Sequence, residues 1–331
     1  MKPVVPHASA SGFFPRSLAR TALAIVLLAA IALATPLHAV PPSVTLEPQN
    51  TSTVDGQNAS FTGAASGDPT PVLLWQRKPA GSDTWQTLSQ GGVFSGVATP
   101  TLVLTGVTYA MNGDQFRFVA ANGEVPDAIS AAATLTVGPV APTVIQHPAN
   151  AVTAAGTPAQ FNVTASGTLP LSYQWHGPDG QPIDGATAAS LTLANPQSAQ
   201  AGVYRVFVSN VAGSVPSNFA SLTVTPSAPT ITTPPASQSA YETQSVTFTV
   251  VARGTEPFTY QWQRNNVALD GATSASLTVE NITVANAGDY RVIVTNGVSS
   301  PASATATLTV LAAAPAITTA PLFQSVAPDA T

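Results

Sequence analysis

The sequence repeats itself at intervals of 87 and 86 residues, and this periodicity limits the possible folds more than any other feature. The tripeptide Ala-Pro-Thr or Ala-Pro-Ala begins at Ala141, Ala228 and Ala314, and a related start lies at Pro41. The starts at Pro41, Ala141 and Ala228 are each followed by the same order of signals. The order is a Trp, a Leu-x-Leu or Leu-x-Val run, an aromatic-Arg pair and a Leu-Thr-Val run. Such self-similarity indicates tandem domains, each about the size of one small β-sandwich.

Within a repeat, apolar residues alternate with polar ones. Phe161, Val163 and Ala165 alternate with Asn and Thr, which is the period of two expected of a strand with one buried face. Turn signals such as Asp184-Gly185 separate these runs, and no helical periodicity is present. Many short strands between turns predict an all-β fold of antiparallel β-sandwiches.

Composition excludes several classes of function. Hydrophobic residues make up 44% of the 331 residues, which is enough for packed cores. Charged residues are only 8% and the sequence pI is near 5.2, so the chain cannot hold a phosphate backbone and nucleic-acid binding is excluded. The sequence contains no Cys, which excludes disulfides, thiolate metal sites and a Cys nucleophile together.

The N-terminal segment has the layout of a Sec-type secretory signal. Lys2, Arg16 and Arg20 form a basic leader, and an almost wholly apolar run follows over 21–34. A membrane-spanning helix needs roughly 20 residues, so we expect cleavage after Ala39 rather than an uncleaved anchor. Cleavage leaves 7 of the 10 Lys and Arg against 15 Asp and Glu, a net charge of −8. We therefore expect a secreted, cell-surface or periplasmic protein that does not insert into the membrane after cleavage.

The second and third repeats share motifs that carry a family resemblance. Both contain Tyr-Gln-Trp, ending at Trp175 and Trp262, and both contain A-G-x-Y-R-V-x-V-x-N around Tyr204 and Tyr290. This order resembles immunoglobulin I-set-like domains, and it is especially similar to the cysteine-free versions found in tandem in exported bacterial proteins. The resemblance covers 41–311 and implies tandem immunoglobulin-like sandwiches in an extended array.

The resemblance implies roles for particular positions. Six aromatic side chains are expected in the cores: Trp75, Trp175, Trp262, Phe116, Tyr204 and Tyr290. Each corner Tyr is expected to bond nearby backbone through its hydroxyl. The positions of the family's inter-sheet disulfide fall on apolar residues, which are expected to pack against each other: Val163 with Val206, Val250 with Val292, and Gly63 with Phe118.

Three departures from the family pattern stand out. Gln200 and Asn286 replace the usual Asp four residues before the corner Tyr, which puts the usual buried ion pair in doubt. In the first repeat Phe116 replaces the corner Tyr, so no hydroxyl bond can form there. The same repeat has a second Trp, Trp85, in a longer segment that is similar to the extra strand of other bacterial repeats.

The repeat starts and the resemblance predict the domain limits. They are a signal peptide over 1–39, a divergent first domain over 40–138, a second domain over 139–225, a third domain over 226–311, and an incomplete start of a fourth repeat over 312–331. This last stretch lacks the strands that close a sandwich, so either the chain is a fragment of a longer protein, which we expect, or the stretch is a disordered remnant. Short joints with Pro predict a monomeric rod.

One surface pattern is a candidate for contacts. Arg117, Arg205 and Arg291 each follow a core aromatic, so each is expected to point outward beside the strand of the buried Trp. His176 is expected on the same outer face, and Trp85 is either a sugar-stacking platform or a half-buried strand residue. For the three arginines and His176 the favoured interpretation is a solvated sheet face that prevents stacking, and the alternative is a repeated contact surface for a glycan or protein.

No pattern indicates catalysis, a metal site or a cofactor. Asp179 and Asp184 are explained by turn chemistry rather than by a carboxylate pair or calcium. The sequence thus favours an exported adhesion or binding module or spacer that meets an unknown protein or glycan at the cell surface. The alternatives are the N-terminal non-catalytic stalk of a larger exported, possibly polysaccharide-acting, enzyme, and a periplasmic chaperone-like sandwich.

Overall fold

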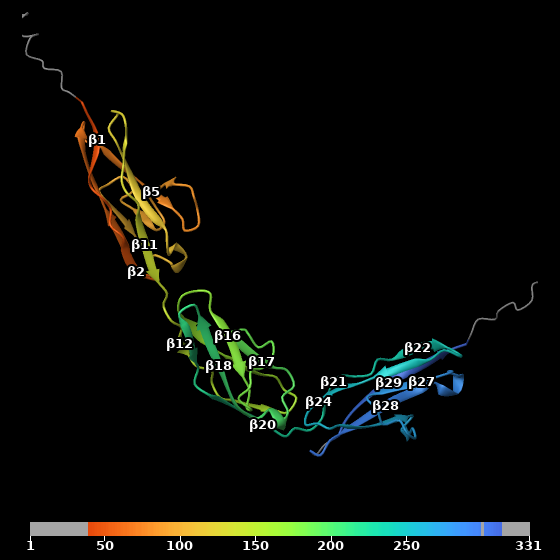
Figure 1. Cartoon of the computed structure of the whole chain (residues 1–331). Helices are drawn as coiled ribbons and strands as arrows, with labels where there is room; N and C mark the ends of the chain where they lie inside the picture. The colour runs from red at the N-terminus through yellow and green to blue at the C-terminus, as the bar shows by residue number, and fades with distance from the viewer. Residues whose placement is uncertain (1–38, 299–300, 313–331) are drawn as a thin grey trace, which may run out of the picture. The chain divides into compact units, whose positions relative to one another are not determined.

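The computed structural model describes residues 39–298 and 301–312, and it confirms the all-β architecture (Figure 1). The predicted signal as far as His38 and the predicted fourth repeat beyond Ala312 lie outside the described residues. The chain divides into two compact units after Gly138, which we describe separately. The predicted domain limits and the rod remain predictions.

The first unit is one β-sandwich. Its larger sheet has the order β2-β11-β9-β5-β6 with β10 paired to β9, a second sheet has the order β3-β8-β7, and β1 pairs with β4. The elements are β1 (Val40–Leu46), β2 (Thr51–Val54), β3 (Ala59–Thr62), β4 (Ala64–Asp68), β5 (Val72–Lys78), β6 (Gln86–Thr87), β7 (Phe94–Ser95), β8 (Thr101–Leu104), the 3-10 helix η1 (Tyr109–Met111), β9 (Gln115–Ala121), β10 (Ala128–Ile129) and β11 (Ala133–Gly138).

The second unit contains two more copies of this strand arrangement. The earlier copy has β13-β20-β18-β16 with β19 on β18, together with the pairs β14-β17 and β12-β15. Its elements are β12 (Thr143–Gln146), β13 (Ala151–Ala154), β14 (Ala159–Asn162), β15 (Thr164–Ser166), β16 (Ser172–His176), β17 (Ser190–Leu193), the 3-10 helix η2 (Ser198–Gln200), β18 (Gly202–Asn210), β19 (Gly213–Pro216) and β20 (Ala220–Thr225).

The later copy has β22-β29-β28-β25-β26, with the pairs β23-β27 and β21-β24. Its elements are β21 (Thr230–Thr233), β22 (Gln238–Tyr241), β23 (Val246–Thr249), β24 (Val251–Arg253), β25 (Thr259–Arg264), β26 (Val267–Ala268), β27 (Ser276–Val279), the 3-10 helix η3 (Val284–Asn286), β28 (Gly288–Thr295) and β29 (Ala302–Leu311).

The sandwiches are not wholly antiparallel. In each copy the second strand pairs in parallel with the last strand: β2 with β11, β13 with β20, and β22 with β29. A buried proline precedes each of these strands: Pro48, Pro148 and Pro235. Proline has no N–H for a sheet ladder, so the chain leaves one sheet there and joins the other.

Each core is built around a Trp and an aromatic pair. Trp75, Trp175 and Trp262 are fully buried. Their indole N–H groups donate to the carbonyls of Thr99, Ala188 and Ser274, each at 2.9 Å. These bonds satisfy the one polar group that a buried Trp carries, so the ring can fill the core without an unpaired donor.

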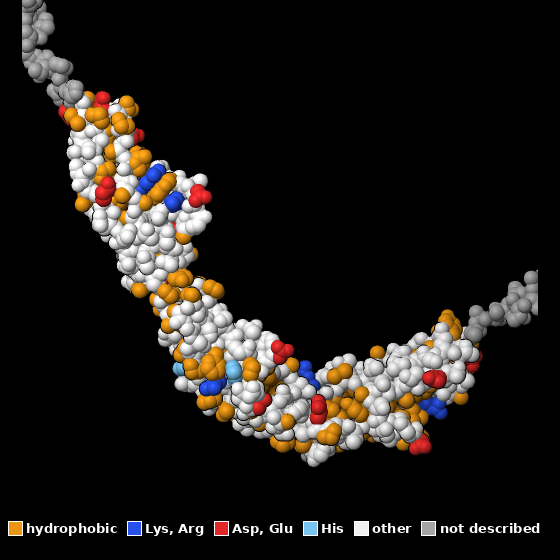
Figure 2. All heavy atoms as spheres, viewed as in Figure 1, with side chains coloured by type: hydrophobic (Ala, Val, Ile, Leu, Met, Phe, Trp, Pro, Cys, Tyr) orange, Lys and Arg blue, Asp and Glu red, His pale blue; other side chains and the backbone are white. Residues whose placement is uncertain are grey.

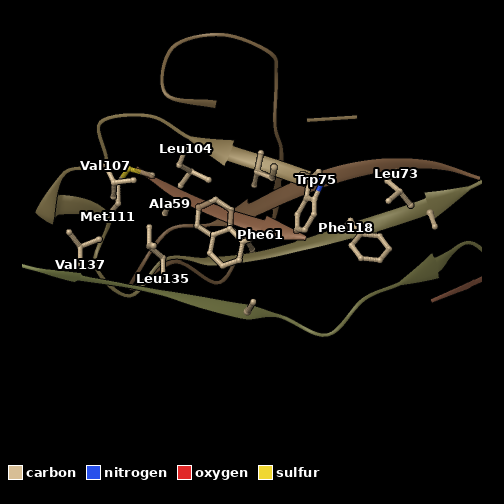
Figure 3. Packing of buried hydrophobic residues seen from close by; sticks show 14 residues of the cluster. Ala59, Phe61, Leu73, Trp75, Leu104, Val107, Met111, Phe118, Leu135 and Val137 are labelled. Carbon is tan, nitrogen blue, oxygen red and sulfur yellow. The ribbon is translucent and has the colours of Figure 1, made fainter. Parts of the chain in front are cut away.

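The aromatic pair bridges the two sheets. Phe61 stacks on Phe116 with ring centroids 4.8 Å apart in the first copy. The matching pairs are Phe161 with Tyr204 at 5.2 Å and Phe248 with Tyr290 at 4.9 Å. Figure 3 shows Phe61, Trp75 and Phe118 of the first copy pointing into the same core. Stacked aromatic pairs of this kind add roughly 0.5–1.5 kcal/mol beyond the area that they bury.

The positions of the absent disulfide hold different side chains in different copies. In the first, a Cβ added to Gly63 would lie only 2.2 Å from the Phe118 ring, so that ring occupies the space above the glycine. Val163 and Val206 belong to the core of the second copy. Val250 and Val292 occupy the same positions in the third.

The polar contacts beside the aromatic pair also differ. The hydroxyls of Tyr204 and Tyr290 donate to the carbonyls of Gln200 and Asn286 at 2.7 and 2.9 Å. The Gln200 and Asn286 side chains accept backbone N–H groups at the start of η2 and η3 instead of forming an ion pair.

The first copy has an ion pair in this region. The Asp114 side chain is 1% exposed, and its Oδ2 accepts from Nε and from a terminal nitrogen of Arg77, each at 2.6 Å. Its Oδ1 accepts the backbone N–H of Ala80 at 2.8 Å. A buried ion pair therefore occurs in the repeat where the corner Tyr is replaced by Phe116, two residues after Asp114.

Candidate functional site

Three arginines occupy the same register position on the larger sheet of each copy. Across adjacent antiparallel strands, Arg117 pairs with Gln76, Arg205 with His176, and Arg291 with Gln263. Because side chains alternate along a strand, each Arg points to the outer face, away from the buried aromatic residue before it. The structure thus places His176 beside Arg205 on the outer face, as expected, and a Gln beside each of the other two arginines, but the contacts of the arginines differ from copy to copy.

In the first copy, two cations lie over one indole. The Arg117 guanidinium carbon is 4.2 Å from the centroid of the Trp85 ring, and Nζ of Lys78 is 5.5 Å from it. Nε of Arg117 also donates to Oε1 of Gln76 at 2.9 Å. Trp85 is half-buried, and the guanidinium covers a face of its ring. Cation–π contacts at exposed sites contribute roughly 0.5–1 kcal/mol each and hold the planar guanidinium in place.

In the second copy, the Arg lies between two Phe rings. The Arg205 guanidinium is 4.6 Å from the centroid of Phe207 and 5.0 Å from that of Phe219, which is 59% exposed. The His176 ring packs on Phe207 with centroids 4.8 Å apart. Nδ1 of His176 is 2.9 Å from the Gly180 carbonyl in the following turn. This cluster is therefore largely aromatic, with the Arg205 guanidinium as its cation.

In the third copy, the Arg lies in a polar hollow. A terminal nitrogen of Arg291 donates to the hydroxyl of Ser303 at 3.0 Å. The hollow is also lined by Asp289 and by Asn265 and Asn266, which form the β25–β26 turn with positive φ values. A carboxylate shares this hollow with the Arg, so its positive charge is partly balanced.

Sequence reasoning missed the residues that distinguish these surfaces. Lys78, Phe207 and Phe219 were not among the predicted contact residues, although Lys78 lies two positions after Gln76 and Phe207 two after Arg205. Residues two apart on a strand share a face, so this signal was present in the sequence. The position of Phe219 depends on the turn after β19 and has no such signal.

The predicted acidic turns contain no metal cluster in the described part of the chain. Oδ1 of Asp179 accepts the backbone N–H of Gln181 at 3.0 Å, as expected of an Asp that closes its own turn. Asp184 lies in the next turn.

Two tyrosines of the second unit have a raised pKa. Burial is the main reason that the pKa of Tyr204 is above its usual value, and the charge of Asp179 adds to it. Burial, and to a lesser degree the charge of Glu256, also raise the pKa of Tyr260. Both shifts keep these phenols neutral and able to donate a hydrogen bond.

The paired sheets, the buried Trp and the tyrosine corner define a protein built from tandem immunoglobulin-like domains. A model of the immunoglobulin domain family matches residues 228–296, within the third copy. The third copy therefore matches this family by sequence, and the chain contains no Cys. No helix among the described residues is long and apolar enough to cross a membrane.

Two curated proteins are similar over part of the chain. Endoglucanase C of Cellulomonas fimi is 32% identical over 189 residues, covering 55% of this chain and 16% of that protein. Neuroglian of Drosophila melanogaster is 32% identical over 152 residues, covering 45% of this chain and 11% of that protein. The matches thus span less than a fifth of the length of either relative.

Solved structures of tandem immunoglobulin domains are also similar. An I-band fragment of titin is 19% identical, covers 82% of this chain and 99% of its own, and has a TM-score of 0.29. The N-terminal eight immunoglobulin domains of the Down syndrome cell adhesion molecule are 20% identical, cover 83% of this chain and 37% of their own, and have a TM-score of 0.40.

Proposed function

We propose that the chain is an exported, non-catalytic immunoglobulin-like array that acts as a binding module through its outer sheet faces. If it binds nothing, the array is a spacer. One observation carries the proposal: the three copies keep the same buried Trp and aromatic pair, yet the same outward Arg has a different set of neighbours in each. A surface that only solvates a sheet needs no aromatic side chains around its cations, yet Arg117 and Arg205 both have them.

The test compares the outer arginines with a cation elsewhere. Residues 40–312 are applied to immobilised polysaccharides and to cell-wall preparations, as wild type, as the Arg117→Gln, Arg205→Gln, Arg291→Gln triple variant, and as the control Arg264→Gln. A binding module is retained, and the triple variant is retained at least about tenfold more weakly than the control. Wild type that passes through every matrix would leave only the spacer role.

A second candidate rests on one specific similarity. The match to Endoglucanase C covers a minor part of that enzyme, which favours a role as the N-terminal non-catalytic stalk of a larger exported polysaccharide-acting protein. The test is the intact mass and cell fraction of the native protein from its source. A mass equal to that of residues 40–331, outside the cytoplasm, supports the stand-alone module; a much larger mass supports the stalk.

A further inference from the structure

Two cations of the first copy converge on one aromatic ring without an acidic partner. Arg117 and Lys78 both lie over Trp85, at 4.2 and 5.5 Å from the ring centroid. Within the described residues the sole ion pair is that of Arg77 with Asp114, so neither Arg117 nor Lys78 forms an ion pair. Figure 2 shows the Lys and Arg side chains of this unit beside hydrophobic ones, with an acidic side chain close by.

The guanidinium is held in place and still has donors to offer. Nε of Arg117 donates to Gln76, and the Trp85 ring lies against the guanidinium plane. Over the part of the chain that the structure describes, its two terminal nitrogens donate to no protein acceptor. An immobilised guanidinium with free terminal N–H groups matches the two oxygens of a carboxylate, and a nearby ammonium adds a second charge-assisted bond.

The equivalent surfaces of the other copies are less suited to an anion. Arg205 lies between Phe207 and Phe219, and the only other titratable group in that cluster is His176. Arg291 shares its hollow with Asp289, whose charge opposes an incoming carboxylate. Among the three described surfaces, the first alone joins two cations that form no ion pair to one aromatic ring.

Neutral hydrogen-bonding side chains surround the two cations. The registers of β5 with β6 and β9 place Gln76, Thr87 and Gln115 on the same outer face as Lys78 and Arg117. Amide and hydroxyl groups suit a ligand that carries many hydroxyls besides its carboxylates. This combination favours a sugar acid over an acidic peptide, which lacks such hydroxyls.

From this geometry we propose that the outer face of the first domain binds uronic-acid residues of an anionic polysaccharide. The Arg117 fork and the Lys78 ammonium bind the carboxylate, and Trp85 positions the guanidinium. Thr87 and Gln115 face the sugar hydroxyls, while Gln76 is held by its bonds to Arg117 and Thr87. The inference rests on the proposed binding role and adds the class of ligand.

The experiment uses two probes that share a backbone. Affinity electrophoresis of residues 40–312 is run in gels with polygalacturonate and with its fully methyl-esterified form, in which every carboxylate is neutral. Polygalacturonate retards the wild type, and the ester does not. The retardation weakens steeply with added salt, because contacts between exposed charges are screened.

Variants assign the binding to this face. Lys78→Gln with Arg117→Gln lowers the affinity for polygalacturonate at least about tenfold, since two charge-assisted contacts are lost. Trp85→Ala lowers it several-fold although both cations remain, because the guanidinium is no longer held. Arg264→Gln removes one charge in the third copy and leaves the affinity unchanged. Circular dichroism checks that each variant is folded.

Several results would overturn the inference. One is a methyl ester that retards the protein as strongly as polygalacturonate does, or polygalacturonate that does not retard it at all. Another is an Arg264→Gln variant that loses as much affinity as the Lys78 and Arg117 double variant. A third is poly-glutamate or dextran sulfate that binds as tightly as polygalacturonate. Retention of the protein on a neutral polysaccharide, unaffected by the Lys78 and Arg117 substitutions, would overturn the uronate site while leaving the proposed binding role intact.

Discussion

The first copy and the two copies of the second unit reach the same sandwich through different polar contacts. In the second unit, Tyr204 and Tyr290 each donate to a backbone carbonyl four residues earlier. In the first, Phe116 fills that place, and a buried ion pair between Arg77 and Asp114 lies beside it. The difference shows that the aromatic ring at the corner is required for packing, whereas the polar contact can be supplied in more than one way.

The disulfide positions teach the same lesson about volume. The first copy combines the smallest side chain, Gly63, with the large ring of Phe118, and the second combines Val163 with Val206. Each combination fills the gap between the two sheets without a covalent bond. A core tolerates such exchanges when the total volume is conserved.

The largest effect is expected when the ion pair of the first copy is broken. Asp114→Ala leaves Arg77 and the Ala80 N–H without their acceptor, and we expect a loss of about 3–5 kcal/mol in the free energy of unfolding, at the lower end because the Arg77 side chain is 25% exposed. Hydrogen-exchange mass spectrometry of residues 40–312 measures this loss in peptides of the first copy.

A double replacement separates the contribution of the ion pair from the cost of leaving Arg77 without a partner. Arg77→Met with Asp114→Leu removes both charges, so it should restore most of the stability lost in Asp114→Ala. If the double variant is as unstable as the single one, the ion pair is worth more than its hydrophobic substitute, and the two kinds of contact are not interchangeable.

Exchange of the core residues tests the volume argument. In Gly63→Val the new side chain collides with the Phe118 ring, and we expect a loss of about 1–3 kcal/mol or more. Phe118→Val alone leaves a cavity and should cost about 2–4 kcal/mol. The double variant recreates the Val–Val combination of the other copies, so its loss should be at least about 1 kcal/mol smaller than the sum of the two. Additive losses in a chemical denaturation series would refute the shared-volume explanation.

Removal of the corner hydroxyls should have a smaller effect. Tyr204→Phe and Tyr290→Phe keep the stacked ring and lose one hydrogen bond each, for about 0.5–1.5 kcal/mol per variant. Exchange protection should fall in the copy that carries the substitution. A loss above about 3 kcal/mol in either copy would mean that the hydroxyl has a packing role that Phe116 cannot fill.

A backbone difference predicts a small gain. Gly56 and Gly156 adopt positive φ at the turn after the second strand, and Thr243 holds that conformation in the third copy with φ 70°. A β-branched residue is strained there, so Thr243→Gly should stabilise the third copy by about 0.5–1 kcal/mol. The matched change Gly56→Thr should destabilise the first, and thermal denaturation compares both with wild type.

Much of the fold could be predicted from the sequence, because the repeat compares three versions of one pattern. The burial of Trp75, Trp175 and Trp262 was expected from the family resemblance that the repeated motifs carry. The Arg77–Asp114 pair could not be predicted, since its two residues are far apart in sequence and occur in one repeat only. The parallel strand pairs were not predicted either, because a strand that changes sheets keeps its alternation; the proline before each of them was the one signal in the sequence.

The candidate site was predictable to a smaller degree. Strand alternation placed Arg117, Arg205 and Arg291 on the outer face. What each Arg contacts depends on the loops and short strands beside it, and these differ among the copies. The sequence therefore predicted one repeated surface, whereas the structure has three different ones.

The smallest expected effect is a pH dependence of stability, which Tyr204 of the second copy has and Phe116 at the same position of the first copy lacks. Because burial, with the Asp179 charge, raises the pKa of Tyr204 above about 10, the folded state binds its phenol proton more tightly than the unfolded state. The stabilisation is complete below pH 10 and is lost as the pH rises from there through the folded pKa. Tyr204→Phe lacks this titration, as the Phe116 corner of the first copy does.

In thermal denaturation between pH 8 and pH 11.5, the stability difference between wild type and Tyr204→Phe should stay constant to about pH 9.5 and then shrink. Tyr260 is present in both proteins and cancels in the difference, so parallel curves over the whole range would mean that the Tyr204 hydroxyl is not protected from ionisation.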